Sequence, residues 1–173
     1  MLTVGHGVAG RDRLGQLLSD AGVQLLVDVR RFPGSRRNPD LGREELMRWL
    51  PEMGIAYRWE EALGGRRRLP AGEPTQDGWW TVPAFRAYAA HTRTPQFDQA
   101  LDRVLADNAR HPTAVMCSES LWWRCHRRLI ADVAILARHE SVEHLTPDGR
   151  RNPHRLAEGA RLGPDGLVFW DGT

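Results

Sequence analysis

The clearest hydrophobic pattern along the chain spans residues 112–138, where a short apolar run precedes a long amphipathic stretch. The run at 113–116 follows a proline and ends at Cys117, as is typical of an interior parallel strand. Downstream, apolar side chains recur three or four residues apart, as on one face of a helix. That face carries Cys125, Leu129, Val133 and Leu136. The pattern predicts a buried strand, a polar loop in which Ser118 and Ser120 are candidate N-caps, and a long helix.

Similar spacings divide the rest of the first 146 residues into further elements. They predict strands at 2–4, 23–30, 55–59 and 141–146, and helices at 11–21, 43–53, 83–92 and 95–108. Gly22 is the expected stop of the first helix. The first strand, helix and strand form a right-handed βαβ unit, so those two strands should be parallel. The succession predicts an α/β fold: a single domain whose central, mainly parallel sheet is flanked by helices in a Rossmann-like three-layer arrangement.

The pattern changes after Pro147. Residues 147–173 are polar, rich in glycine, proline and arginine, and lack a complete apolar stripe. Residues 167–170, LVFW, are the exception and form a candidate docking strand. The sequence thus predicts an α/β domain over 1–146 and a polar C-terminal extension over 147–173.

Composition and charge narrow the class of protein. A net charge of +2 gives the chain no overall field that would attract nucleic acid. No apolar run approaches the roughly 18 residues needed to span a membrane, and the first residues, MLTVGHG, lack the pattern of a secretory signal. The two cysteines suggest free thiols rather than a disulfide framework. We therefore expect a cytoplasmic protein with no membrane association.

All 24 basic residues are arginines, and several of them are clustered. Codon bias accounts for most surface arginines, but it explains three clusters less well. These are Arg30 and Arg31 with Arg36 and Arg37; Arg66 to Arg68; and Arg124 with Arg127 and Arg128. Arginine binds phosphate or carboxylate through a bidentate fork, so clusters meeting on one face would form an anion site.

One of these clusters directly follows a predicted strand, and another lies near the start of the predicted helix. Ser35, Arg36 and Arg37 lie in the loop RFPGSRRNPDLG and are candidate anion ligands. Arg124 and Arg127 lie in or near the first turns of the predicted helix, where they oppose its dipole. Such placement indicates that an anion is expected at that helix start.

Candidate catalytic residues gather between the strand at 113–116 and the helix that follows it. Cys117 lies at the strand end, where open α/β sheets place their sites and where a thiol can have a lowered pKa and act as a nucleophile. Glu119 and His126 are candidate proton carriers, although His126 could equally be a hydrogen-bonded core residue. Cys125, on the apolar stripe, is interpreted as a packed core cysteine.

Further candidates lie at the ends of the first two predicted strands. Glycines flank His6 and allow a sharp bend that leaves the imidazole at the strand end. Asp28 interrupts an apolar strand and shares a face with Arg30. A buried carboxylate must be paired, so we expect an ion pair that either fixes the loop internally or orients Arg30 toward a ligand.

Four sequence strings together resemble a known family. They are TVGHG at the start, LLVDVRRFPGSRRNP, ALGG, and MCSES followed by WRCHR. In this order and at these distances they are similar to the DUF488 family, over most of residues 2–146. The resemblance implies a compact α/β domain with a site built from strand ends, and it implies no particular reaction.

Several functions are compatible with these residues. The first is a cysteine-dependent enzyme acting on a small anionic substrate, with arginines holding a phosphate or carboxylate. The alternative is a non-catalytic module that binds a nucleotide or a short nucleic acid through arginine and tryptophan. A standard phosphatase loop is excluded, because six residues rather than five separate Cys117 from Arg124 and none of them is glycine.

A metal centre is the least favoured interpretation. Cys117, Cys125 and His126, with His6 or His144 as a further group, would supply the ligands. The seven residues between the two cysteines do not match the usual zinc spacing, so we expect neither a metal nor a cofactor.

Overall fold

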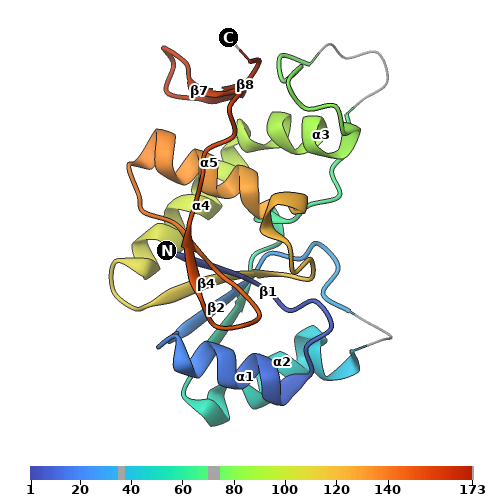
Figure 1. The fold of residues 1–173 in the computed structure, drawn as a ribbon, viewed down its shortest axis with the longest axis vertical. Coiled ribbons are helices and arrows are strands. Elements are labelled where there is room, and N and C mark those ends of the chain that lie inside the picture. The colour runs from blue at the N-terminus through green and yellow to red at the C-terminus, as the bar shows by residue number, and fades with distance from the viewer. Residues whose placement is uncertain (35–37, 70–74, 173) are drawn as a thin grey trace.

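The computed structural model describes residues 1–34, 38–69 and 75–172 (Figure 1). The strands are β1 Leu2–Gly5, β2 Leu25–Asp28, β3 Ala56–Trp59, β4 Thr113–Cys117, β5 Glu143–Leu145, β6 Arg151–Pro153, β7 Ala160–Leu162 and β8 Val168–Trp170. The α-helices are α1 Arg11–Asp20, α2 Arg43–Trp49, α3 Pro83–Thr92, α4 Pro95–Asn108 and α5 Arg127–Arg138. Short 3-10 helices lie at η1 Pro39–Leu41, η2 Pro51–Met53, η3 Glu61–Leu63 and η4 Trp122–Arg124.

Six strands form one sheet in the order β3-β2-β4-β1-β5-β6. The first five are parallel, and β6 pairs with β5 in the antiparallel direction. This confirms the predicted α/β domain with a mainly parallel central sheet. The first two strands are parallel, as predicted, but β4 lies between them and pairs with both.

Helices cover both faces of the sheet, which gives the three layers visible in Figure 1. Helices α1 and α2 lie on one face, and α3, α4 and α5 lie on the other. Alternate residues of β4 point to opposite faces: Ala114 and Met116 pack in the cluster beneath α1 and α2, whereas Val115 and Cys117 pack against α3 to α5. No helix in the described part of the chain is both long enough and apolar enough to cross a membrane.

The start of α5 differs from the prediction. The helix begins at Arg127, because the turn η4 and an extended Cys125 (φ −121°, ψ 149°) come first. Its N-cap is His126, which makes no side-chain capping bond, so neither Ser118 nor Ser120 caps it. Cys125 therefore precedes the helix instead of lying on its apolar stripe.

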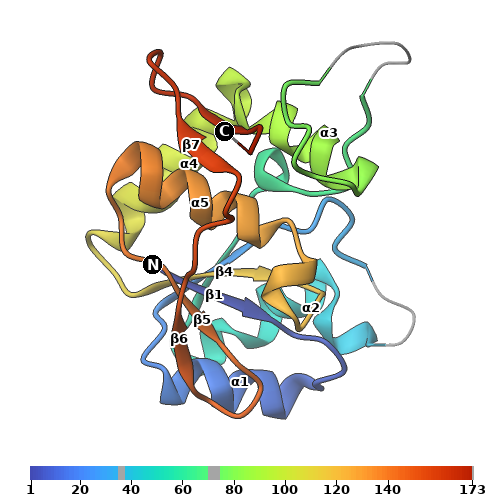
Figure 2. The ribbon, with the colours of Figure 1, turned by 45° about the horizontal axis from the view of Figure 1, so that its top comes forward.

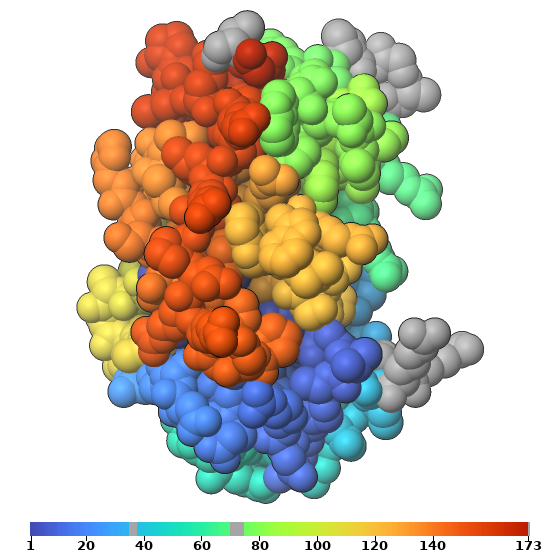
Figure 3. Space-filling view, viewed as in Figure 1, coloured from blue at the N-terminus to red at the C-terminus, as the bar shows by residue number. Residues whose placement is uncertain are grey.

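The C-terminal segment after β5 returns along the molecule toward the helices (Figure 2). It first adds β6 to the edge of the main sheet and then forms a separate antiparallel pair, β7 and β8. Trp170, at the end of β8, is fully buried in the core that contains α3 to α5. In Figure 3 this segment, orange to red, covers a continuous strip of the face shown.

Candidate functional site

The carboxyl ends of β1, β2 and β4 meet at one edge of the sheet, because β4 pairs with both of the other strands. A cleft of about 580 Å³ opens there. It is lined by six of the residues predicted from the sequence to form the site: His6, Arg30, Cys117, Glu119, Arg124 and His126. Parallel strands that end side by side thus bring together segments separated by more than 100 residues.

The other predicted residues are placed differently. Asp28 and Arg127 are buried behind the lining of the cleft and do not form part of its surface. Ser35, Arg36 and Arg37 lie outside the described residues.

The expected ion pair between Asp28 and Arg30 is confirmed. The Nε and Nη2 atoms of Arg30 donate to the two Asp28 oxygens at 2.9 and 2.6 Å, and both residues are buried. Tyr57 donates its hydroxyl to the same carboxylate at 2.8 Å, and Nη2 of Arg30 also donates to the Leu41 carbonyl. These bonds therefore fix the Arg30 side chain and tie it to η1, the short 3-10 helix before α2.

His6 is held between the backbone and Arg30. Its Nδ1 lies 3.1 Å from the Gly7 carbonyl oxygen, and its Nε2 lies 3.3 Å from Nη1 of Arg30. Burial and then the charge of Arg30 lower the pKa of His6 to about 4. Nδ1 must donate to the carbonyl and Nε2 must accept from the guanidinium, so His6 is a neutral imidazole at the cleft wall.

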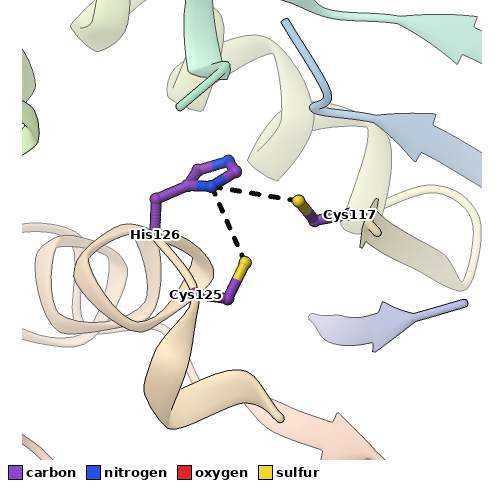
Figure 4. Close-up of side chains that lie close together, drawn as sticks. All are labelled: Cys117, Cys125 and His126. Atoms are coloured by element: carbon purple, nitrogen blue, oxygen red, sulfur yellow. Dashed lines mark hydrogen bonds between the residues drawn. The ribbon is translucent and has the colours of Figure 1, made fainter. Parts of the chain in front are cut away.

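Two thiols and one imidazole lie close together (Figure 4), and all three residues line the cleft. The Nδ1 atom of His126 lies 3.6 Å from the Sγ of Cys125 and 3.9 Å from the Sγ of Cys117. The three atoms all lie within 4.8 Å of one another, and both cysteines are free. Gly65 packs against the imidazole, since a Cβ at that position would lie 2.7 Å from Nδ1.

Arg127 lies behind these three residues and is 1% exposed. Its Nε donates to the Cys125 Sγ at 3.4 Å, its Nη1 to the Thr3 hydroxyl at 3.4 Å, and its Nη2 to the Glu119 carbonyl oxygen. Within the described ranges no carboxylate forms an ion pair with it. A buried charge requires an opposite charge nearby, and Cys125 is the acidic group that Arg127 contacts.

This contact gives the two thiols different pKa values. Burial by itself would raise the pKa of Cys125, but hydrogen bonds from Cys117 and Arg127, together with the Arg127 charge, lower it to about 6. The hydrogen bond to Cys125, and then burial, raise the pKa of Cys117 to about 12. The pKa of Cys117 is therefore raised, where the sequence led us to expect a lowered value, and Cys125 is the more acidic of the two thiols.

The arginine clusters converge only in part. Arg31, Arg66 and Arg124 line the cleft together with Arg30. Arg66 and Arg124 are exposed, and neither forms an ion pair with any described residue. Arg128 instead lies over the rings of Trp79 and Trp80, its Cζ 5.5 and 5.0 Å from their centroids. Trp80 is 5% exposed, so this aromatic pair packs on the core.

Glu119 has two separate roles in this geometry. Its carboxylate Oε1 accepts from the backbone N–H of Leu121 at 3.1 Å, which holds the loop after β4. Its backbone carbonyl accepts from Arg127, and Gly5 provides the room for that contact, because any Cβ at Gly5 would overlap the same oxygen. The side chain still lines the cleft, where a ligand can reach it.

Residues that the sequence analysis did not assign to the site also line the cleft. They include Arg31, Phe32, Gly65, Arg66, Tyr88 and Cys125. A signal existed for Gly65 and Arg66, which belong to the string ALGGRRR. For Cys125 the useful signal was an arginine two residues later, which the interpretation of 125–136 as one regular helix concealed.

The three ligand atoms of Cys117, Cys125 and His126 also have the spacing of a metal centre. A tetrahedral ion with Zn–S of about 2.3 Å and Zn–N of about 2.0 Å separates its sulfur and nitrogen ligands by roughly 3.5 Å. The observed separations of 3.6 and 3.9 Å are close to this edge length. Among the described residues these three are the group that could hold an ion.

Residues 11–134, more than half of the chain, match the family model described as "Domain of unknown function DUF488". No curated protein and no solved structure matches the chain. The family match covers β2, β3, β4 and most of α5, including both cysteines and His126. The resemblance inferred from the sequence strings is confirmed, and the chain belongs to the DUF488 family.

Proposed function

We propose that this protein binds a small anion, a phosphate or a carboxylate, in the cleft and presents it to a reactive thiolate at Cys125. The observation that carries the proposal is the buried guanidinium of Arg127, which contacts the Cys125 sulfur and no carboxylate among the described residues. A thiolate is both the nucleophilic form of cysteine and the charge that Arg127 requires. The sequence favoured Cys117 as the nucleophile, and the geometry favours its neighbour.

Cys117 and His126 support this thiolate in different ways. Cys117 keeps its proton, and its Sγ lies within 4.8 Å of the Cys125 Sγ, so it can deliver that proton to a leaving group. His126 borders the cleft, and its buried Nε2 has no hydrogen-bond partner in the part of the chain that the structure describes. An unpaired buried nitrogen costs free energy, so a bound ligand that pairs with it is favoured.

The anion part of the proposal rests on the unpaired arginines of the cleft. The charge of Arg30 is balanced by Asp28, which leaves Arg66 and Arg124 as exposed guanidinium groups at the cleft. Because the net charge of the chain is only +2, the attraction is local to the cleft. This favours a small anion over an extended polyanion, whose binding would need many phosphate contacts.

Two alkylating reagents that differ in charge test both parts. Iodoacetate carries a carboxylate and iodoacetamide is neutral, so the ratio of their rates at Cys125 measures the attraction of the cleft for an anion. We expect Cys125 to react below about pH 7, well below an ordinary thiol. We also expect iodoacetate to be favoured severalfold more than it is with free cysteine.

Variants make the test specific. Arg66→Gln and Arg124→Gln should each lower the rate ratio, whereas Arg155→Gln, which changes an exposed arginine outside the cleft, should not. Inorganic phosphate should slow alkylation in the wild type and less so in the cleft variants. Thiols that stay inert until the chain unfolds would refute the thiolate. A rate ratio equal to that of free cysteine would refute the anion site.

A metal centre is the second candidate function, and the close approach of three ligand atoms favours it. Purified protein titrated with Zn²⁺ or with Co²⁺, whose thiolate complexes absorb in the near ultraviolet, would show one equivalent bound. Cys117→Ser should abolish that binding while leaving Arg127 in contact with Cys125. Failure to bind either ion at micromolar concentration would leave the thiolate proposal as the sole candidate.

A further inference from the structure

A chain of buried hydrogen bonds connects Arg127 to the C-terminal segment. From Arg127 it passes through the Thr3 hydroxyl to Nδ1 of His144 at 2.7 Å, and from Nε2 of His144 to Nδ1 of His154 at 2.8 Å. It ends where Nε2 of His154 meets Oδ1 of Asp132 at 2.8 Å. Thr3, His144 and Asp132 are each at most 1% exposed, and the side chain of His154 is fully buried.

The end of this chain fixes the direction of its protons. The Asp132 carboxylate only accepts, and it also receives the backbone N–H of Ala157 and the indole N–H of Trp170. Nε2 of His154 must therefore donate to it. In neutral His154, Nδ1 then accepts from Nε2–H of His144.

The hydrogen bonds between His144, Thr3 and Arg127 have directions set by the same donors and acceptors. His144 accepts the Thr3 hydroxyl proton at Nδ1, and the Thr3 oxygen is left to accept the Nη1–H of Arg127. Every donor points from Arg127 toward Asp132. Each group has one role that its neighbours determine, so the order of the chain fixes the orientation of its members.

Packing holds the histidines in this arrangement. The ring of Trp122 stacks on His144, with centroids 4.1 Å apart and planes 7° from parallel. Burial is the largest cause that lowers the pKa of His144 to about 3, so the ring is neutral. Trp122 belongs to η4, the turn between the two cysteines, so the stack also joins this chain to the loop that carries Cys125.

We propose that the chain Thr3–His144–His154–Asp132 is a positioning device that holds Arg127 against the Cys125 sulfur and thereby sets the reactivity of that thiol. This inference rests on the proposed function and extends it to residues 143–170, which lie beyond the matched family region. It gives the C-terminal segment a specific role: His154 and Trp170 reach Asp132 on α5 and orient the guanidinium from behind.

A purely structural role fits the observations less well. Buried polar groups seldom stabilise a core more than apolar side chains of the same shape would, and they become costly when one partner is missing. Here Thr3 of β1 and Asp132 of α5 are the outer partners of the two histidines, and the chain leads to Arg127, the guanidinium that contacts the Cys125 sulfur among the described residues. Removal of one hydrogen bond in the middle of the chain should therefore change the reactivity of Cys125 more than it changes the stability of the fold.

The test measures the pH midpoint of Cys125 alkylation by iodoacetamide, peptide by peptide, since cleavage after Arg124 separates the two cysteines. Thr3→Val keeps the shape and removes the link. We expect it to raise the midpoint by about one unit, which lowers the rate at pH 6 about fivefold. Thr113→Val is the matched control, because Thr113 is equally buried and its hydroxyl bonds only to the His111 carbonyl.

A second pair of variants checks the histidine itself. His154→Leu removes both nitrogens and should raise the midpoint, whereas His154→Gln keeps one donor and one acceptor and should largely restore it. Thermal unfolding of each variant separates these effects from loss of structure. If His154→Leu does not fold, Thr3→Val alone decides.

The failures of the two proposals are distinguishable. A low wild-type midpoint that Thr3→Val leaves unchanged overturns the positioning device and leaves the reactive thiolate standing. A wild-type midpoint near about 8.5, the value of an ordinary thiol, overturns the thiolate itself and this inference with it. A shift in Thr3→Val and His154→Leu but not in Thr113→Val or His154→Gln supports the device.

Discussion

The Nε atom of Arg127 lies 3.4 Å from the Sγ of Cys125, and both side chains are almost completely buried. A guanidinium cannot lose its proton in this setting, so the charge balance is set by the thiol. This single contact is the basis for proposing Cys125, in place of Cys117, as the reactive thiolate. It also links the reactivity of the site to the stability of the fold.

The stability of the protein should depend on pH through Cys125. Its pKa is lowered from 9.0 to about 6 in the folded chain, so its contribution is fully present above about pH 9 and is lost as the pH falls to 6. Between these values the free energy of unfolding should rise by about 1.4 kcal/mol per pH unit from this group. Above pH 9 the free energy of unfolding should fall again, because the raised pKa of Cys117 keeps this thiol protonated in the folded chain while it ionises in the unfolded chain. Urea denaturation under reducing conditions at several pH values, compared with Cys125→Ser, measures this slope, and equal slopes in both proteins would contradict it.

Breaking the ion pair between Asp28 and Arg30 should be strongly destabilising. Asp28→Asn leaves a buried guanidinium without its counter-charge, which typically costs roughly 3–5 kcal/mol. The double variant Asp28→Asn with Arg30→Met removes both charges and should recover much of the loss. Urea denaturation of the wild type and the two variants measures the free energy of unfolding of each. A loss below about 1 kcal/mol in the single variant would show that water reaches the pair.

Gly5→Ala should disturb the site directly. A Cβ at Gly5 would overlap the Glu119 carbonyl oxygen and lie 2.7 Å from Nη2 of Arg127, so the loop after β4 must move away. We expect a loss of stability of several kcal/mol, at the upper end of single substitutions, and slower alkylation of Cys125. Gly10→Ala is the matched control, because nothing lies within 4 Å of its Cβ. Equal unfolding temperatures for the two variants would mean that the loop after β4 does not pack closely against Gly5.

Gly65→Ala should change the reactivity of the cysteines more than the stability of the fold. The added methyl would lie 2.7 Å from Nδ1 of His126 and force the ring to shift relative to the two sulfurs. We expect a shift in the pH profile of Cys125 alkylation with a loss of stability of about 1 kcal/mol. Gly78→Ala, an exposed glycine with open space around it, provides the comparison. An unchanged profile would show that His126 does not influence the thiols.

The fold was predictable because its signals are local. Helices α3 and α4 occur at the predicted residues, and Gly22 ends the first helix with a positive φ of 69°. The insertion of β4 between β1 and β2 could not be read from the chain, since hydrophobic period specifies a strand but not its neighbours. The predicted start of α5 was wrong, because the apolar spacing of 125–136 continues back into residues that do not belong to the helix.

From the sequence, only those cleft residues could be predicted that lie at the ends of buried strands. His6, Arg30 and Cys117 line the cleft because each lies at or just beyond the end of a buried strand, and parallel strands end at the same edge. The choice between Cys117 and Cys125 depends on a buried guanidinium, and burial of an arginine is the rarer case that sequence reasoning does not select. The chain from Thr3 to Asp132 joins residues up to 141 positions apart and has no sequence signature.

The position of β4 in the sheet has a consequence for folding. β1 and β2 are made early in synthesis, but their shared neighbour begins at Thr113, more than 80 residues after β2 ends. Until β4 enters, these two strands present unpaired edges, and both cysteines are still absent or solvent-exposed. The low pKa of Cys125 can therefore arise only after the most non-local step of folding is complete. A thiol that reacts at low pH would report the native topology itself.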